Sequence, residues 1–128
     1  MNSKMKKSLE TQVGGTHYLS AYQCYEFIGD QHYNFTQGNI LKYMTRHRLK
    51  NGAEDLLKVI DYCNMGEESN ELLLKNIYPY SVEHSMRFLE ANKKVDFDEY
   101  FLLRLYHGDY EFCRKVAEKI LHDVYGQK

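Results

Sequence analysis

The chain has 128 residues, of which 43% are hydrophobic and 27% are charged, a balance typical of one folded domain rather than a disordered tail. No stretch approaches the roughly 18 apolar residues that cross a bilayer, and the N-terminus lacks the apolar core of a secretory signal. The net charge of −1 disfavours a binder of double-stranded DNA, because such proteins neutralise many phosphates.

Three cysteines, Cys24, Cys63 and Cys113, lie far apart in the sequence. An odd number without CxxC spacing predicts free thiols in a reducing compartment, here the cytoplasm, and no zinc site. We therefore expect no metal and no required cofactor.

The N-terminal part predicts a tail, a loop and a short helix. Residues 1–11 are polar and are expected to form a flexible tail. A loop containing Gly14 and Gly15 follows, and Ser20 is the expected N-cap of a helix that Gly29 and Asp30 end. The apolar positions of that helix recur at helical spacing: Ala21, Cys24, Tyr25 and Ile28.

Two longer helices are expected next. Thr36 is the expected N-cap of a helix through about Leu49, and a further helix begins near Ala53 and ends or kinks at Gly66. The expected buried positions of the first are Ile40, Leu41, Met44 and His47. Those of the second are Leu56, Leu57, Ile60 and Cys63.

The C-terminal part predicts three more helices after a break at Pro79. Ser81 is expected to cap a helix through about Ala91 that buries Val82, Met86 and Leu89. Phe97, Phe101 and Leu105 mark the next helix, which ends at Gly108. The last helix covers residues 109–125, and its apolar positions are Cys113, Val116, Ala117, Ile120 and Val124.

The predicted fold is therefore all-α, a compact bundle of about six helices, in a single domain over residues 1–128. Within it, residues 12–64 and the C-terminal extension 65–128 differ in charge, because the extension contains twelve Asp and Glu residues.

Basic residues are concentrated in one acid-free stretch. Between Asp30 and Glu54 there is no acidic residue, whereas Lys42, Arg46 and other bases occur there. Such an island indicates either a local anionic ligand or an ordinary solvated helix face.

One face of the expected second helix combines an amide, an ammonium, a phenol and a guanidinium. Asn39, Lys42, Tyr43 and Arg46 fall at positions i, i+3, i+4 and i+7 and so share a face. This set suits a phosphorylated ligand, with charges for phosphate and a ring for stacking. The alternative is an exposed helix without a ligand.

Two further groups are candidates for the same site. In the next helix Glu54 and Lys58 are expected to form a surface salt bridge; the functional alternative is that Glu54 and Asp55 orient Lys42 or Arg46 or hold a divalent cation. The glycine loop before His17 and Tyr18 is either a phosphate cradle or a plain turn, and it lacks P-loop spacing.

The stretch from His17 to Tyr62 resembles a small domain that is common in bacteriophage genomes, catalogued as of unknown function and often labelled nucleotide kinase. Its pattern is HY, then GN-x-x-KY-x-x-R, then K-x-G and EDL-x-K, and a final Tyr. The matching residues here are His17, Tyr18, Gly38, Asn39, Lys42, Tyr43, Arg46, Lys50, Gly52, Glu54, Asp55, Leu56, Lys58 and Tyr62.

The resemblance implies a phage-encoded nucleotide-binding protein, and one characterised protein with such a domain is a nucleoside monophosphate kinase without a P-loop. The catalytic candidates are then His17, Lys42 and Arg46. The candidate nucleotide-binding residues are Gly15, His17, Tyr18, Asn39, Lys42, Tyr43, Arg46, Glu54, Asp55 and Lys58.

Two non-catalytic alternatives stay open. The protein is either a module that sequesters a nucleotide signal, or an effector of host takeover that binds and inhibits a host defence protein. In the last case its acidic half would imitate nucleic acid.

A homo-oligomer is also expected. The segment from Phe97 to Tyr106 is apolar on all sides, so it lies either in the middle of the bundle or against another subunit.

Overall fold

The computed structural model describes residues 22–69 and 77–127, and within these ranges the chain forms six α-helices and one 3₁₀ helix, without strands. The all-α prediction is confirmed. The expected tail, the glycine loop and the helix start at Ser20 lie outside the described residues. The elements in chain order are α2 (Cys24–Gln31), α3 (Phe35–Arg46), the 3₁₀ helix η2 (His47–Leu49), α4 (Ala53–Glu68), α5 (Val82–Ala91), α6 (Glu99–Tyr106) and α7 (Tyr110–Tyr125).

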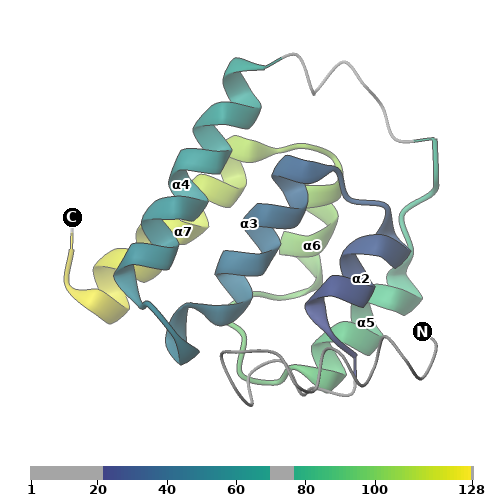
Figure 1. The fold of residues 1–128 in the computed structure, drawn as a ribbon, viewed down its shortest axis with the longest axis horizontal. Helices are drawn as coiled ribbons and strands as arrows, with labels where there is room; N and C mark the ends of the chain where they lie inside the picture. Colours follow the sequence, from purple (N-terminus) through teal and green to yellow (C-terminus); the bar gives the residue numbers. More distant parts are fainter. Residues whose placement is uncertain (1–21, 70–76, 128) are drawn as a thin grey trace.

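The helices form two layers of three (Figure 1). In the front layer, α3 packs between α2 and α4, and in the rear layer α6 packs between α5 and α7. Between the layers, α4 lies on α7 and α2 lies on α5. The boundary expected between residues 64 and 65 falls inside α4, so this helix crosses from one half of the sequence into the other.

The core lies where the two layers meet. Phe27 of α2 and Phe88 of α5 stack at a centroid distance of 4.6 Å, and both are fully buried. Other apolar side chains with no exposed surface extend the core along the bundle: Ile40, Leu41, Met44, Leu56, Val59, Cys63, Leu102, Leu105, Cys113 and Ala117.

Hydrogen bonds from two polar side chains connect α6 to α3 and to the residues just before α3. The hydroxyl of Tyr33 donates to the carbonyl of Leu102 at 2.9 Å. The amide of Gln37 donates to the carbonyls of Leu105 and Tyr106, at 2.8 and 3.0 Å. Because the last carbonyls of a helix lack i+4 partners within it, Gln37 supplies extra donors at the C-terminal end of α6, where the carbonyl of Leu105 also accepts from the N–H of Gly108 at 3.0 Å.

Most helices begin at a side-chain cap. Asn34, rather than the expected Thr36, caps α3, since its carboxamide accepts from the backbone N–H of Gln37 at 2.8 Å. The side chain of Gln37 in turn accepts from the N–H of Asn34, which completes a capping box. Ser81 caps α5 as predicted.

Two expected helix ends are wrong. The helix predicted to stop at Gly29 and Asp30 continues to Gln31, and His32 ends it in the left-handed conformation with φ of 59°. Gly66 does not end α4, which continues to Glu68. Instead Gly66 leaves room for the ring of Tyr110 from α7.

Some expected core positions are wrong as well. Leu57, Val82, Met86 and Val124 are exposed. In these helices other positions are buried instead, namely Asp55 and Val59 in α4, Ser85 and Phe88 in α5, and Leu121 in α7.

The apolar character of the segment around α6 is explained by its position. This helix is the middle member of the rear layer, with α3 in front of it (Figure 1). Phe101, Leu102 and Leu105 are accordingly buried, while Tyr100 is exposed. The internal position removes the reason given for a subunit contact there, and the homo-oligomer stays a prediction.

Candidate functional site

The α3–α4 pair places the predicted binding residues on one surface. Lys42, Tyr43 and Arg46 follow one another on the side of α3 away from its buried residues Ile40 and Met44. Because α4 packs along α3, its polar side approaches this face.

The ring of Tyr43 is the centre of this surface. The Cζ atom of Arg46 lies 4.7 Å from the ring centroid. The Nζ atoms of Lys42 and Lys58 lie 5.5 and 5.0 Å from the same centroid. Three cationic groups from two helices therefore surround one half-buried phenol. Such contacts are favourable because the face of an aromatic ring carries negative potential.

A buried carboxylate holds Arg46 in this position. Asp55 has no exposed surface, and its Oδ2 and Oδ1 atoms lie 3.4 and 3.5 Å from Nε and Nη2 of Arg46. The N–H of Asn51 also donates to this carboxylate, at 3.3 Å. Both contacts to the guanidinium are long, and neither involves its Nη1 atom, so the cation keeps donor capacity for a ligand.

A row of aromatic rings continues from Tyr43 along the pair of helices. Tyr62 of α4 stacks on Tyr43 with a centroid distance of 6.1 Å and an interplanar angle of 14°. The ring of Phe35 meets Tyr62 edge to face at 6.2 Å. The composite surface of cations and rings thus joins Lys42, Tyr43, Arg46, Lys58, Tyr62 and Phe35, and we call it the α3–α4 face.

The other candidate residues have different positions. Asn39 donates its amide to the carbonyl of Phe35 at 2.9 Å, so part of its hydrogen-bonding capacity is used within the helix. Glu54 lies 4.0 Å from Lys58 in the expected i,i+4 pair. Gly15, His17 and Tyr18 lie outside the described residues. Sequence reasoning did not include Phe35 or the stacking role of Tyr62, although an exposed aromatic residue at the start of a helix is a signal that could have been used.

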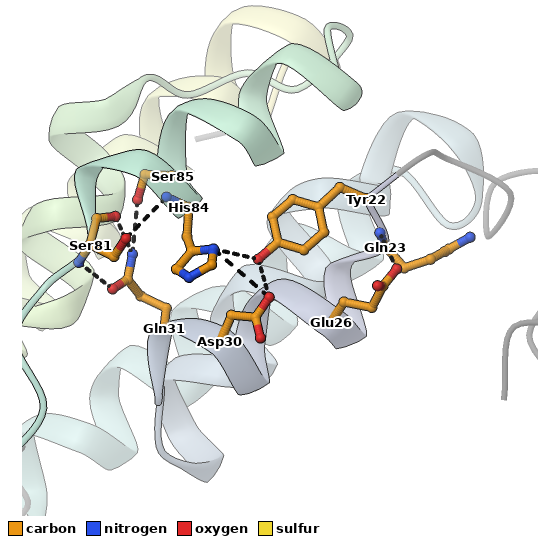
Figure 2. Close-up of polar contacts among 8 residues, drawn as sticks. All are labelled: Tyr22, Gln23, Glu26, Asp30, Gln31, Ser81, His84 and Ser85. Atoms are coloured by element: carbon orange, nitrogen blue, oxygen red, sulfur yellow. Dashed lines mark hydrogen bonds and ion pairs between the residues drawn. The ribbon is translucent and has the colours of Figure 1, made fainter. Parts of the chain in front are cut away.

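A second polar cluster joins α2 to α5 (Figure 2). The hydroxyl of Tyr22 donates to Asp30 at 2.5 Å, and Nδ1 of His84 lies 3.2 Å from the same hydroxyl. Burial, followed by the hydrogen bond to Asp30, raises the pKa of Tyr22 above its usual value. Arg87 covers the Tyr22 ring at 4.3 Å. The phenol is therefore protonated at neutral pH, donates its proton to Asp30 of α2, and connects the layers through its contact with His84 of α5.

Gln31 extends this contact between the layers (Figure 2). Its amide nitrogen donates to the carbonyl of Ser81 at 2.8 Å and to the hydroxyl of Ser85 at 3.0 Å. Its amide oxygen accepts from the N–H of Ser81 at 2.7 Å. The buried amide thus has partners on both sides, which is what its burial requires.

A third cluster is centred on the buried His47. Its Nδ1 atom lies 2.7 Å from the hydroxyl of Tyr125, and its Nε2 atom lies 2.7 Å from Oδ2 of Asp96. Burial lowers the pKa of His47, although Asp96 acts in the opposite direction. Arg48 binds the same carboxylate through two hydrogen bonds, at 2.7 and 3.0 Å.

The cysteines are all free, as predicted. Burial raises the pKa of the Cys24 and Cys63 thiols to about 12 and that of Cys113 further. All three are protonated at neutral pH and are poor nucleophiles, because the thiolate is the reactive form. Among residues 22–69 and 77–127, no three His, Cys, Asp or Glu side chains gather in a way that would bind a metal ion. Within the same ranges no helix has the length and apolar character needed to span a membrane.

The comparisons with known proteins gave one match. Residues 14–64 match the model of a family described as proteins of unknown function, DUF3310. The comparison with curated proteins and the comparison with solved structures found no match. The matched segment contains α2, α3 and most of α4, which form the front layer of the bundle, and it includes the residues of the α3–α4 face.

Proposed function

We propose that the cationic end of the α3–α4 face, around Tyr43, binds a phosphorylated nucleoside. The observation that carries the proposal is the gathering of Lys42, Arg46 and Lys58 within 5.5 Å of the centroid of one aromatic ring, Tyr43. Cations supply charge-assisted hydrogen bonds to phosphate oxygens, and aromatic rings stack with bases.

The existing ion pairs on this face leave the cations available. Lys58 and Glu54 are 38% and 69% exposed and lie 4.0 Å apart, and an exposed pair of this kind contributes only about 0.3–0.5 kcal/mol. A phosphate group, with more charge and more acceptor oxygens than a carboxylate, competes effectively for Lys58. Arg46, in contrast, is fixed by the buried Asp55, so it is positioned before a ligand arrives.

Phosphoryl transfer is the activity to test at this face. That chemistry depends mainly on positioned charges around the phosphates, and it requires little covalent participation by the protein. Lys42 and Arg46 would bind and orient phosphate oxygens in such a reaction. A protein that only sequesters a nucleotide would use the same contacts without turnover.

Equilibrium titration of the full chain with nucleoside monophosphates tests the proposal, with the unphosphorylated nucleosides as ligand controls. Lys42→Ala removes an exposed cation and should weaken monophosphate binding by about tenfold or more, since a charge-assisted hydrogen bond contributes about 1.5–3 kcal/mol. Lys119→Ala, an exposed lysine on α7, is the matched control and should leave binding unchanged. Arg46→Ala is a poorer probe, because it would also leave Asp55 buried without its cation.

The outcomes separate the alternatives. Binding that depends on Lys42, with a nucleoside diphosphate formed from ATP and the monophosphate, supports a kinase. Binding with the same dependence and no product supports a sequestering protein. Equal affinity of wild type and Lys42→Ala for every monophosphate, or no binding of any of them, contradicts the proposed function.

A further inference from the structure

The aromatic row of the α3–α4 face extends beyond its cations. Phe35 is the first residue of α3, and Tyr43 follows eight residues later on the same helix. At a rise of about 1.5 Å per residue, these two positions are separated by roughly 12 Å along the helix axis. Tyr62 fills the interval, since it contacts both rings. The row is therefore longer than the footprint of one stacked base.

Packing does not account for the position of Phe35. Its ring is 73% exposed, more than any other aromatic side chain in the described residues, and it meets Tyr62 only edge to face. Single exposed apolar residues are common on protein surfaces. This one, however, continues a row of two other rings whose far end lies among three cations. The combination of rings and cations is complementary to stacked bases and their phosphates.

The dimensions and the charges of the face match a short single strand. In a stacked strand one phosphate occurs about every 3.4 Å, so roughly 12 Å accommodates a few linked nucleotides. Proteins bind single strands by combining aromatic stacking with a positively charged track along the backbone. Residues 31–53, which include all of α3, contain no acidic residue, so no carboxylate on α3 repels a phosphate. Glu54 lies 4.0 Å from Lys58, and their exposed pair would yield to a phosphate.

We propose that the ligand of the α3–α4 face is a short single-stranded oligonucleotide, with one base on Phe35 and its phosphodiesters at Lys42, Arg46 and Lys58. This inference rests on the proposed function and specifies the class of nucleotide. A mononucleotide would occupy the cationic end alone and would leave Phe35 without a role.

The sequence offers a direct reporter for this contact. The chain contains no tryptophan, so Phe35→Trp introduces a single fluorophore at the proposed stacking position. A tetranucleotide should quench its emission at concentrations that saturate binding, whereas a monophosphate should leave it nearly unchanged. DNA and RNA versions of the tetranucleotide form two arms that identify the preferred sugar.

Removal of the ring gives the decisive comparison. Phe35→Ala should weaken tetranucleotide binding by about tenfold and should leave monophosphate binding unchanged, as expected from the loss of one stacked base. Tyr25→Ala on α2 is the control, because Tyr25 is 61% exposed and lies outside the aromatic row. Circular dichroism melts of each variant report whether the fold is retained.

The results distinguish failure of this inference from failure of the proposed function. If monophosphate and tetranucleotide bind equally well, and Phe35→Ala changes neither affinity, the oligonucleotide is excluded and the nucleotide site stands. If neither ligand binds to the wild-type chain, both proposals are wrong. Tetranucleotide binding that is weakened about tenfold in Phe35→Ala and in Lys42→Ala, and is unchanged in Tyr25→Ala, supports the inference.

Discussion

Replacing Gly66 by alanine should destabilise the protein, although alanine is the better helix former. Gly66 lies inside α4, where Gly→Ala normally stabilises a helix by about 1 kcal/mol. Here an added Cβ would lie 2.5, 2.6 and 2.7 Å from three ring atoms of Tyr110. These distances are far inside van der Waals contact. The ring or the helix must therefore move.

The size of the effect follows from how little the ring can move. Tyr110 is only 2% exposed, and overpacking at such a buried site costs roughly 1–3 kcal/mol. Because all three distances are short, we expect the upper part of that range, and a net loss of about 1–2 kcal/mol after the gain in helix propensity. The melting temperature should fall by roughly 4–8 °C.

Thermal melts and urea titrations of two variants test this reasoning. Gly29→Ala is the matched control, since it also lies in a helix but has no neighbouring atom within 4 Å of its Cβ position. It should stabilise the protein by up to about 1 kcal/mol. In a Tyr110→Leu background, Gly66→Ala should lose most of its cost. A Gly66→Ala protein that melts at or above the wild-type temperature would refute the argument.

Three further predictions concern the clusters and the core. Burial lowers the pKa of His47, so the unfolded chain binds the proton first as the pH falls; stability should decrease below about pH 6.5, and His47→Gln should flatten this dependence in urea titrations at pH 5 and pH 7. Asp55→Ala should cost roughly 3–5 kcal/mol in the same assay, because it leaves the cation of Arg46 without its buried partner. Leu121→Ala should cost about 2–5 kcal/mol, whereas Val124→Ala, at an exposed position, should change the free energy of unfolding by less than about 0.5 kcal/mol; equal losses for the two would contradict the observed face of α7.

The sequence was sufficient to predict where the helices lie, but it predicted less well which side of each helix is buried. Apolar spacing located every helix in the described ranges, because amphipathic periodicity is a local property. The predicted buried face of α5 was wrong. The prediction favoured Val82 and Met86 because they are more apolar than Ser85, whereas the structure buries Ser85. Ser85 is buried with its hydroxyl satisfied by the amide of Gln31, 54 positions earlier. A partner so distant in the sequence leaves no local signal.

The helix ends show a different kind of error. Gly29 was interpreted as a breaker, yet α2 continues through it because an isolated glycine lowers helix stability without preventing a helix. Asn34 could have been recognised as the cap of α3, since Gln37 stands three residues later in the pattern of a capping box. In the first case the glycine was given too much weight as a helix breaker. In the second case the capping-box pattern was present in the sequence but was not used.

Some residues of the candidate site could likewise be predicted from local spacing, whereas others depend on packing between helices. That Lys42, Tyr43 and Arg46 share a face followed from helical spacing alone. The addition of Lys58, Tyr62 and the buried Asp55 required the packing of α4 on α3, which spacing within one helix does not contain. Asp55 was expected either to orient Lys42 or Arg46 or to bind a ligand, and the structure places it beneath the surface, where it contacts Arg46.

The rear layer determines how well this face is held together. Lys58 reaches Tyr43 only while α4 keeps its position on α3, and α7 supports α4 along its length. Tyr110 packs on Gly66 near one end of α4, and Tyr125 packs on Gly52 at the other. A change in these supports should lower stability and ligand binding together, whereas loss of the Lys42 ammonium should lower binding alone. The two classes of variant therefore separate the chemistry of the α3–α4 face from the packing that positions it.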